Sequence, residues 1–474
     1  MSLTANVEPH AIDPRRLEPL IGVERVETLM EAASALRALI GRRRIVNVNS
    51  TANGGGVAEM LATLLGYVRG IGLEADWLVI AGDPEYFAVT KRIHNGLYGS
   101  PGDGGALGKR EHAVYERTSA RNLESIQRRV REGDVVVVHD PQPAGLIGPL
   151  AELGAHVVWR CHVGYDGSNE WTERAWAFVR PYVEAANAHV FSRESFAPEW
   201  IDRAWLRAIP PSIDPFTPKN QELAPFEVFA ILGAAELVSS NGTPPDARVR
   251  RRADVVREGP PPDPAVPLVV QVSRWDRMKD MAGVLEAFAR HVRVSPVHLV
   301  LAGPAVTGVS DDPEGEAVWN ETVSAWRSLS RADRGRIHLA CIPMEDPVEN
   351  AIVINALQRH AAIVVQKSLA EGFGLTVAEA MWKRRPVVAT AVGGIVDQVI
   401  SGETGILVDD PHDLEAFGAA VDRLLRHPAD AERLAHNGRR HIEQRFLGDR
   451  HLLQYAELLA ALLGSSPSGT AEPR

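Results

Sequence analysis

The chain has 474 residues, of which 45% are hydrophobic and 24% are charged, and its formal net charge is -10 at pH 7. This length is too great for one hydrophobic core, so we expect a globular protein of two domains. The negative charge argues against a nucleic acid or an anionic membrane as a partner, and two cysteines are too few for a disulfide framework. Neither a signal segment at the start nor an apolar run of 18 residues is present, so we expect a cytoplasmic protein.

The first half of the chain begins with alternating strand and helix patterns. A helix over 23–40 is followed by a strand over 44–49, the glycine-rich loop of residues 50–56, a helix over 57–69 and a strand over 76–81. The loop has neither the G-x-G-x-x-G spacing nor the GK[ST] ending, so the dinucleotide and P-loop fingerprints are absent. Its glycine triplet either permits a tight turn or lets a substrate approach the backbone, and the residues leave both interpretations open.

Polar residues follow the next predicted strands, which cover residues 134–140, 155–162 and 188–192. His139, Asp140 and Gln142 end one strand, and Arg160 and His162 end the next. Ligands of open α/β sheets bind outside the carboxyl ends of the strands, so Asp140 and His162 are candidates for a binding site. A metal site is disfavoured because no third ligand has a characteristic spacing.

The rigid sequence Pro210–Pro215 suggests a domain boundary, and residues 241–267 read as an exposed loop. Beyond them a second alternating series is predicted, with strands over 268–273, 298–302, 336–341, 361–366, 386–389 and 405–409. Arg274 and Lys279 stand at the end of the first of these strands. An arginine and a lysine at this place suit a diphosphate, although two solvated surface cations are the simpler alternative.

The stretch of residues 368–395 contains two glutamates, Glu371 in a turn and Glu379 in a helix that we expect to begin at Thr376. The N–H groups at a helix start attract anions, and nearby carboxylates suit hydroxyl groups, so a nucleotide sugar fits this stretch. The alternative is a capping box, in which Thr376 caps the helix and Glu379 reaches back to its N–H group.

Helices over 414–446 and 450–463 and a frayed tail over 465–474 complete the chain. We therefore predict an α/β protein with two Rossmann-like doubly wound domains that face each other across a cleft. The expected boundaries are 1–215 for an acceptor domain, 216–445 for a nucleotide-sugar donor domain, and 446–474 for a helix and tail.

Several motifs resemble a known family. Ser273-Arg274, Lys279 and the Glu371-x7-Glu379 spacing are similar to retaining glycosyltransferases of the GT-B fold, family four. More selective matches resemble trehalose glycosyltransferring synthases, over about residues 44–445. They are VNSTANGGGVAEML (48–61), TKRIHNGL (90–97), HDPQP (139–143), WRCH (159–162), PPSID (210–214), DDPEG (311–315) and EGFGLTVAEAMWK (371–383).

The resemblance implies a retaining transfer of glucose from an NDP-glucose to glucose, with trehalose as the reversible product. No permanent cofactor and no essential metal are expected, the partners are small sugars, and a homodimer is left open. The residue roles that the resemblance implies fall into three groups. The catalytic group is Arg274, Lys279, Glu371 and His162; the donor group is Gly372, Phe373, Gly374, Leu375, Thr376, Glu379, Gly55 and Gly56; the acceptor group is Asn49, Asp140 and Gln142.

Two departures from the family pattern are local. An acidic residue is expected sooner after WRCH than the Val-Gly-Tyr-Asp sequence provides, and the loop over 241–267 is longer and richer in proline. Three alternative functions stay open: a trehalose phosphorylase, a non-enzymatic sugar-nucleotide binder on the same fold, and, disfavoured by the missing fingerprint, an NAD-dependent enzyme.

Overall fold

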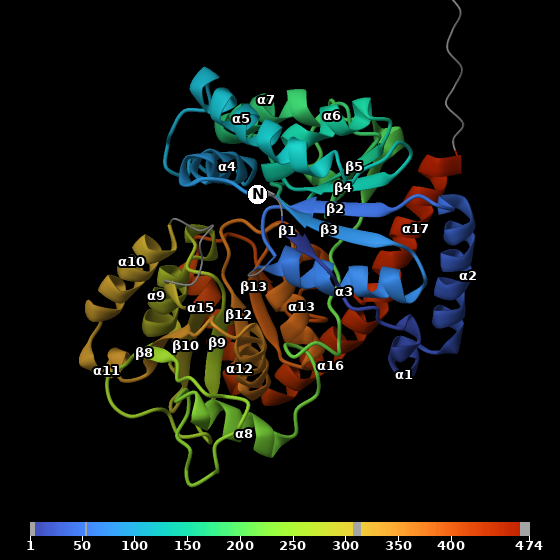
Figure 1. The fold of residues 1–474 in the computed structure, drawn as a ribbon. Helices are drawn as coiled ribbons and strands as arrows, with labels where there is room; N and C mark the ends of the chain where they lie inside the picture. Colours follow the sequence, from blue (N-terminus) through green and yellow to red (C-terminus); the bar gives the residue numbers. More distant parts are fainter. Residues whose placement is uncertain (1–4, 53–54, 307–313, 465–474) are drawn as a thin grey trace, which may run out of the picture. The chain divides into compact units, whose positions relative to one another are not determined.

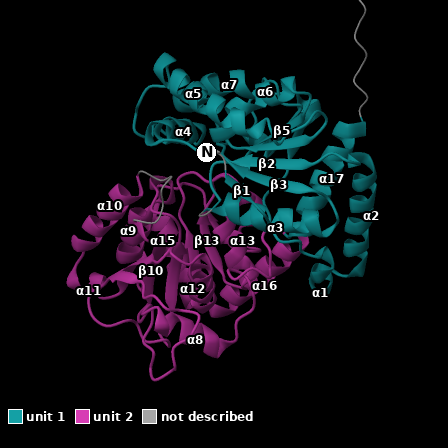
Figure 2. Ribbon diagram, in the orientation of Figure 1, with its two compact units in different colours: residues 1–212, 447–474 teal, residues 213–446 magenta. Residues whose placement is uncertain are grey.

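The computed structural model describes residues 5–52, 55–306 and 314–464. Gly54 of the glycine triplet, Asp311 to Pro313 of the DDPEG stretch and the expected tail over 465–474 lie outside these residues. The chain forms two compact units, which Figure 2 distinguishes by colour. Unit 1 comprises Met1–Ser212 and Leu447–Arg474, and unit 2 comprises Ile213–Phe446. The C-terminal helix thus belongs to the same unit as the N-terminal half of the chain.

Unit 1 contains a seven-stranded sheet with the order β1-β3-β2-β4-β5-β6-β7, in which only β1 is antiparallel to its neighbour among the described strands. The strands β2 and β4 are buried on both faces, as expected for a parallel sheet covered by helices. The strands are β1 (Ala5–Val7), β2 (Ile45–Asn49), β3 (Ala75–Val79), β4 (Val135–His139), β5 (His156–Cys161), β6 (Ala188–Phe191) and β7 (Leu206–Ala208).

Helices cover both faces of this sheet (Figure 1). One core forms beneath α4, α5 and α7, and a second forms beneath α2 and α17. The helices of unit 1 are η1 (Pro14–Leu17), α1 (Glu18–Ile21), α2 (Val23–Ile40), α3 (Gly56–Gly70), α4 (Pro84–Leu97), α5 (Lys109–Ile126), η2 (Gln142–Leu146), α6 (Ile147–Glu152), α7 (Glu170–Val183), η3 (Glu194–Phe196), η4 (Arg203–Trp205) and α17 (Gly448–Gly464).

Unit 2 repeats the plan with a seven-stranded sheet of the order β14-β13-β12-β9-β10-β11-β8, in which β8 is the antiparallel edge strand. The strands are β8 (Asp254–Val256), β9 (Leu268–Val272), β10 (His298–Pro304), β11 (Ile337–Ile342), β12 (Ile363–Gln366), β13 (Val387–Thr390) and β14 (Ile406–Val408). The helices are α8 (Pro225–Ala234), η5 (Arg277–Lys279), α9 (Met281–His291), α10 (Gly315–Arg327), α11 (Arg331–Arg334), α12 (Pro347–His360), α13 (Leu375–Trp382), α14 (Ile395–Gln398), α15 (Leu414–Arg426) and α16 (Pro428–Arg445). The predicted α/β class with two Rossmann-like units is confirmed.

Two expectations about individual elements were wrong, and the edge strand β1, which precedes the predicted helix over 23–40, was not expected. The segment 241–267, expected to be an exposed loop, contains the edge strand β8. The single helix expected over 414–446 is two helices, because His427 leaves the helical conformation before Pro428, whose ring cannot continue the preceding turn. No helix in the described part of the chain is long and apolar enough to cross a membrane.

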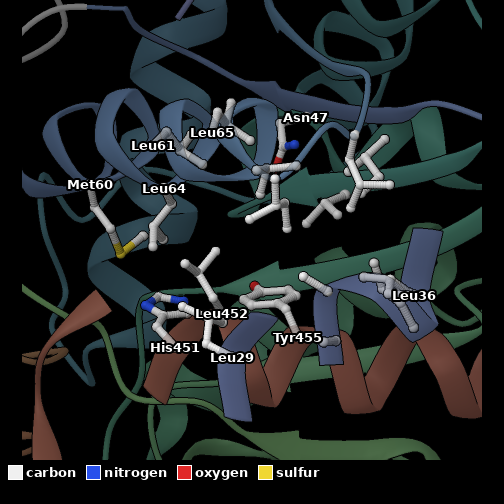
Figure 3. A pocket seen from close by; sticks show the side chains of 18 of the residues that line it. Leu29, Leu36, Asn47, Met60, Leu61, Leu64, Leu65, His451, Leu452 and Tyr455 are labelled. Atoms are coloured by element: carbon white, nitrogen blue, oxygen red, sulfur yellow. The ribbon is translucent and has the colours of Figure 1, made fainter. Parts of the chain in front are cut away.

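The helix α17 packs along α2 within unit 1. Arg25 of α2 donates two hydrogen bonds to Asp449 of α17, at 2.9 and 2.6 Å, and Leu458 and Leu459 join the core under the sheet. Between α2, α3 and α17 lies a cavity of about 70 Å³ (Figure 3). Its wall is mostly apolar, and Figure 3 shows Asn47, His451 and Tyr455 among the leucines that line it.

Candidate functional site

Two turns of unit 2 meet at the carboxyl ends of β9 and β12, which are parallel neighbours in the sheet. Lys279 comes from the first turn and Glu371 from the second. Lys279 Nζ lies 2.6 Å from Glu371 Oε2, although 92 residues separate them, and their side chains are only 16% and 8% exposed. The structure therefore brings together two residues that the sequence analysis assigned to one site, and it makes them an ion pair.

Arg274 lies in the same turn as Lys279. Its Nη2 atom is 3.6 Å from Asp276 Oδ2, and its side chain is 37% exposed, whereas that of Asp276 is 4% exposed. Asp276 Oδ1 in turn accepts a hydrogen bond from the Met278 N–H at 2.8 Å, which fixes the turn. Two cationic side chains thus project from one constrained turn, and the more exposed of them remains accessible to an anion.

A chain of buried polar side chains holds Glu371 in place. Ser368 Oγ donates to Glu371 Oε2 at 3.2 Å, and Gln366 Nε2 donates to Ser368 Oγ at 3.0 Å. Gln366 Oε1 accepts a hydrogen bond from Thr376 Oγ1 at 2.9 Å. Neither Gln366 nor Ser368 was predicted as a site residue. The available signal was a pair of polar residues at the end of a buried strand, the pattern that drew attention to Asp140 and His162.

Gly393 and Gly394 follow β13, at a place where their backbone lies very close to the backbone of Glu371. Gly393 has φ +51°, and a Cβ atom at this position would lie 1.6 Å from the Glu371 carbonyl oxygen. The neighbouring Gly394 N–H donates to the same oxygen at 3.3 Å. The sequence analysis had no specific role for this pair; the structure shows that it lets the backbone of Glu371 lie against the next turn.

The helix α13 begins at Leu375, one residue before the expected start, and Gly374 with φ +86° precedes it. The capping-box interpretation of Thr376 and Glu379 is wrong, because Thr376 lies inside the helix and its hydroxyl bonds Gln366 instead. Glu379 forms an ion pair with Lys219 at 3.8 Å. Lys219 was missed by the sequence analysis, since nothing in its local sequence points to α13.

The start of α13 lies beside the Lys279–Glu371 pair, since a Cβ atom on Gly374 would lie 3.2 Å from Glu371 Cγ, and in its first turn the Val377 N–H donates to the Gly374 carbonyl oxygen at 2.9 Å. Positive charge, helix N–H groups and two carboxylates are therefore grouped in unit 2. This combination suits a ligand that carries both phosphate and hydroxyl groups.

In unit 1, Asp140 directly follows β4 and has φ +66°. Its N–H donates to the Arg160 carbonyl oxygen at 2.7 Å, and its Oδ1 atom accepts from the His162 N–H at 2.7 Å. Burial raises the pKa of Asp140 to about 7, against the opposing effects of the His162 N–H and the Arg160 charge. The predicted pair of strand ends is thus joined directly through Asp140 and His162.

The imidazole of His162 lies against that of His139. His162 Nε2 is 3.2 Å from His139 Nδ1, and the other ring nitrogen of His139 is 2.9 Å from Asn47 Oδ1. Burial and the Arg160 charge lower the pKa of both histidines, that of His139 to about 3. Both rings are therefore neutral at physiological pH, and neither supplies a cation to the site.

The remaining candidates in unit 1 differ in how they are engaged. Both ends of the Asn49 amide are occupied, because Asn49 Oδ1 accepts from Trp77 Nε1 at 2.8 Å and Asn49 Nδ2 donates to the Thr51 carbonyl at 2.7 Å. Gln142 Oε1 is buried and accepts no hydrogen bond from the described residues. Gly55, with φ +85°, precedes α3, which begins at Gly56. Among the described residues, no cluster of three or more histidine, cysteine, aspartate or glutamate side chains is arranged to hold a metal ion.

Comparisons with known proteins place this architecture in a class. Residues 47–198 match the family described as trehalose synthase, N-terminal domain, and residues 254–441 match glycosyl transferases group 1. A sucrose-phosphate synthase from Thermosynechococcus elongatus has a similar structure, with a TM-score of 0.62 and 18% identity over 90% of this chain and 100% of that chain. A trehalose-6-phosphate protein from E. coli, bound with UDP-2-fluoro glucose, gives a TM-score of 0.67 at 12% identity, over 90% of this chain and 100% of that chain. The chain is a glycosyltransferase of the GT-B fold.

Relatives with higher identity narrow the class. A trehalose synthase from Pyrococcus horikoshii is 34% identical over 95% of this chain and 97% of its own length. A trehalose synthase from Rubrobacter xylanophilus is 36% identical over 92% of this chain and 94% of its own length. The chain therefore belongs to the trehalose synthase family. A trehalose phosphorylase from Pleurotus sajor-caju is more distant, at 25% identity over 76% of this chain and 50% of its own length.

Proposed function

We propose that this chain transfers glucose from an NDP-glucose to the anomeric hydroxyl of a second glucose, with retention, and releases trehalose and the nucleoside diphosphate. The observation that carries the proposal is the Lys279–Glu371 pair at 2.6 Å, which sets a cation and a carboxylate side by side at two strand ends. The family of the chain supports the choice of trehalose, and the reaction is reversible because donor and product are both activated at the anomeric carbon.

In the proposed donor site, Arg274 and Lys279 bind the diphosphate, Arg274 with its fork of N–H groups and Lys279 as a point charge. The N–H groups from Gly372 to Thr376 bind phosphate and sugar hydroxyls, since the start of α13 favours negative charge. Glu371 accepts hydrogen bonds from the donor glucose while Lys279 and Ser368 hold its carboxylate. Glu379 accepts hydrogen bonds from the ribose hydroxyls.

In unit 1, His162 of the catalytic group binds the transferred glucose close to the reacting carbon, and Asp140 of the acceptor group orients a glucose hydroxyl. Gly55 and Gly56 belong to the proposed donor group, since they stand at the start of α3, where N–H groups suit phosphate and hydroxyl oxygens. The buried amide oxygen of Gln142 can accept a hydrogen bond from a sugar hydroxyl. Both ends of the Asn49 amide are hydrogen-bonded, to Trp77 and to Thr51, so the proposed role of Asn49 is to position the neighbouring backbone of the site.

The chemistry follows from these charges. The bond from the anomeric carbon to the diphosphate oxygen breaks, and the acceptor oxygen bonds the same face of an oxocarbenium-like glucose. The acceptor proton passes to the departing phosphate oxygen, so no protein base is needed, and attack on the same face makes a protein nucleophile unnecessary. Arg274 and Lys279 lower the barrier by stabilising negative charge that grows on the diphosphate, and no metal ion is expected.

The test is a transfer assay with five NDP-glucoses and glucose, in which NMR identifies the linkage of the product. We expect trehalose with at least one donor, and we expect Arg274→Ala and Lys279→Ala each to lower kcat by about 100-fold or more. Arg277→Ala is the matched control, because Arg277 lies in the same turn, is 48% exposed and pairs with Glu314 and Glu321 at the surface. Near-normal turnover of both site variants would contradict the diphosphate assignment.

Two further arms separate the alternatives. Release of glucose from trehalose that requires inorganic phosphate, with no response to any nucleoside diphosphate, would identify a phosphorylase instead. Binding of NDP-glucose by calorimetry without turnover on any sugar acceptor would identify a non-enzymatic binder.

A further inference from the structure

Three buried side chains form a line that leads to His162. Asn47 lies in β2, His139 ends the adjacent strand β4, and His162 follows β5, which pairs with β4. The three are 4%, 2% and 9% exposed, so only His162 reaches the surface to any extent. The contacts are 2.9 Å from Asn47 Oδ1 to His139 Nε2 and 3.2 Å from His139 Nδ1 to His162 Nε2.

The charges around this line keep both imidazoles neutral. Arg160 is 0% exposed, donates to Ser192 Oγ at 3.4 Å, and lies close enough to both rings for its charge to oppose their protonation. Asp140 contributes the negative charge beside Arg160, and His451 and Tyr455 of α17 are the other titratable groups that face the cluster. A neutral imidazole carries one N–H group and one bare nitrogen, so each ring has a definite direction.

The direction is set at Asn47. Asn47 is placed with Oδ1 toward His139 and with Nδ2 buried and without a partner among the described residues. In this orientation the amide oxygen only accepts, so the nitrogen that contacts it, His139 Nε2, carries the proton. His139 Nδ1 is then bare and accepts a hydrogen bond, so His162 Nε2 carries its proton too. It follows that His162 Nδ1 is bare, and among the described residues nothing donates to this atom.

We propose that His139, set by Asn47, is a positioning residue that holds His162 in the Nε2–H form and presents its bare Nδ1 atom to a sugar hydroxyl. The contact between His162 and the sugar rests on the proposed function. The positions of the protons on the two imidazoles rest only on the contacts among Asn47, His139 and His162. A bare ring nitrogen in a fixed place accepts a hydrogen bond from the hydroxyl and cannot donate one. The orientation costs nothing during binding, because the network already holds it in the free protein.

The first experiment measures the proton directly in the free protein. The chain has 16 histidines, so the His162 signals are assigned by their loss in His162→Asn, in spectra of protein labelled with nitrogen-15 in histidine. We expect a pyrrole-type signal for Nε2 and a pyridine-type signal for Nδ1 of His162. The opposite tautomer, a fast mixture of both tautomers, or an imidazolium at pH 7 would overturn the proposal. This measurement needs no substrate, so it judges the proposal even if the chain makes no trehalose.

The second experiment compares two amide replacements of His139. Asn sets its amide oxygen near the former Nδ1 position, where it accepts from His162, whereas Gln sets its amide near the former Nε2 position and leaves His162 without an acceptor. We expect His139→Gln to lose the single tautomer of His162 and to lower kcat by about tenfold or more, and His139→Asn to stay within about threefold of wild type. Equal losses in both variants, with an unchanged His162 tautomer, would show that His139 is merely structural.

The third experiment reads the direction of the sugar contact. Glucose analogues in which one hydroxyl is replaced in turn by hydrogen or by fluorine are compared as acceptors and, as NDP-sugars, as donors. A bare nitrogen requires a hydroxyl donor, and fluorine cannot donate, so at the position that contacts His162 both analogues should lose kcat/KM to a similar degree. Recovery of activity by the fluoro analogue at every sensitive position would mean that His162 donates, which contradicts the proposal.

Discussion

Replacing Lys279 by methionine tests whether the pair in unit 2 is a buried charge pair. Methionine keeps most of the volume but leaves the carboxylate of Glu371, which is 8% exposed, with Ser368 as its remaining donor. Removing one partner of a buried pair costs about 3–5 kcal/mol, and because the Lys279 side chain is 16% exposed we expect the lower end, about 3 kcal/mol. For a unit of this size such a loss lowers Tm by roughly 6–12 °C.

The double variant Lys279→Met/Glu371→Gln tests whether the two charges interact. It buries no charge, so we expect it to be more stable than Lys279→Met alone, with a coupling energy of about 2 kcal/mol in a double-mutant cycle. The assay is thermal unfolding of the full chain at fixed pH and protein concentration, with Arg277→Ala as the surface control. If the two single changes add to within about 0.5 kcal/mol, the charges do not interact and the reasoning is refuted.

Three further predictions concern stability. Burial raises the pKa of Asp140 from 3.8 to about 7, so its proton stabilises the folded chain most below about pH 4, and this contribution declines as the pH rises to 7. Asp140→Asn keeps the acceptor oxygen and should remove up to about 4 kcal/mol of that pH dependence in thermal melts. An unchanged profile would contradict the shift. Gly393→Ala should lower the free energy of unfolding by about 3 kcal/mol or more, because the new Cβ atom would clash with the Glu371 carbonyl oxygen. The control is Gly402→Ala, where φ is also positive but the space is open, and it should cost only about 1–2 kcal/mol. Similar losses for the two variants in denaturant unfolding would contradict the close approach. Leu64→Ala would enlarge the cavity under α3 and should lower the free energy of unfolding by about 3–5 kcal/mol. The control Leu39→Ala changes a side chain that is 40% exposed and should cost less than about 1 kcal/mol. Equal losses for the two variants would contradict a packed cavity wall.

The sequence carried most of the strand pattern because the central strands are short apolar runs. The segments that form β2, β4 and β9 are buried on both faces. Such strands are nearly continuous apolar runs, so they can be predicted without knowing which strands pair with them. The edge strands β1, β7 and β8 were not predicted, since each has three residues and its pairing is decided by a neighbouring strand.

The candidate sites were predicted as residues at strand ends but not as contacts. The two turns that hold Lys279 and Glu371 meet only because β9 lies beside β12, and strand order is a tertiary property. The capping box at Thr376 followed from a valid local rule, but the Thr376 hydroxyl bonds Gln366 at the end of the preceding strand β12 instead. Asn47 was not predicted as a site residue, because a polar residue inside a strand gives no local sign of its partner on the adjacent strand, which is His139.

The return of α17 to unit 1 has a consequence for synthesis and for truncation. As the chain leaves the ribosome, all of unit 2 is available to fold before the segment that completes unit 1 exists, so the N-terminal half must wait for the last residues to be made. A premature stop after Phe446 would leave unit 2 whole. It would strip unit 1 of Leu458 and Leu459 and leave Arg25 without Asp449, so damage at the end of the gene would appear as a defect of the N-terminal half.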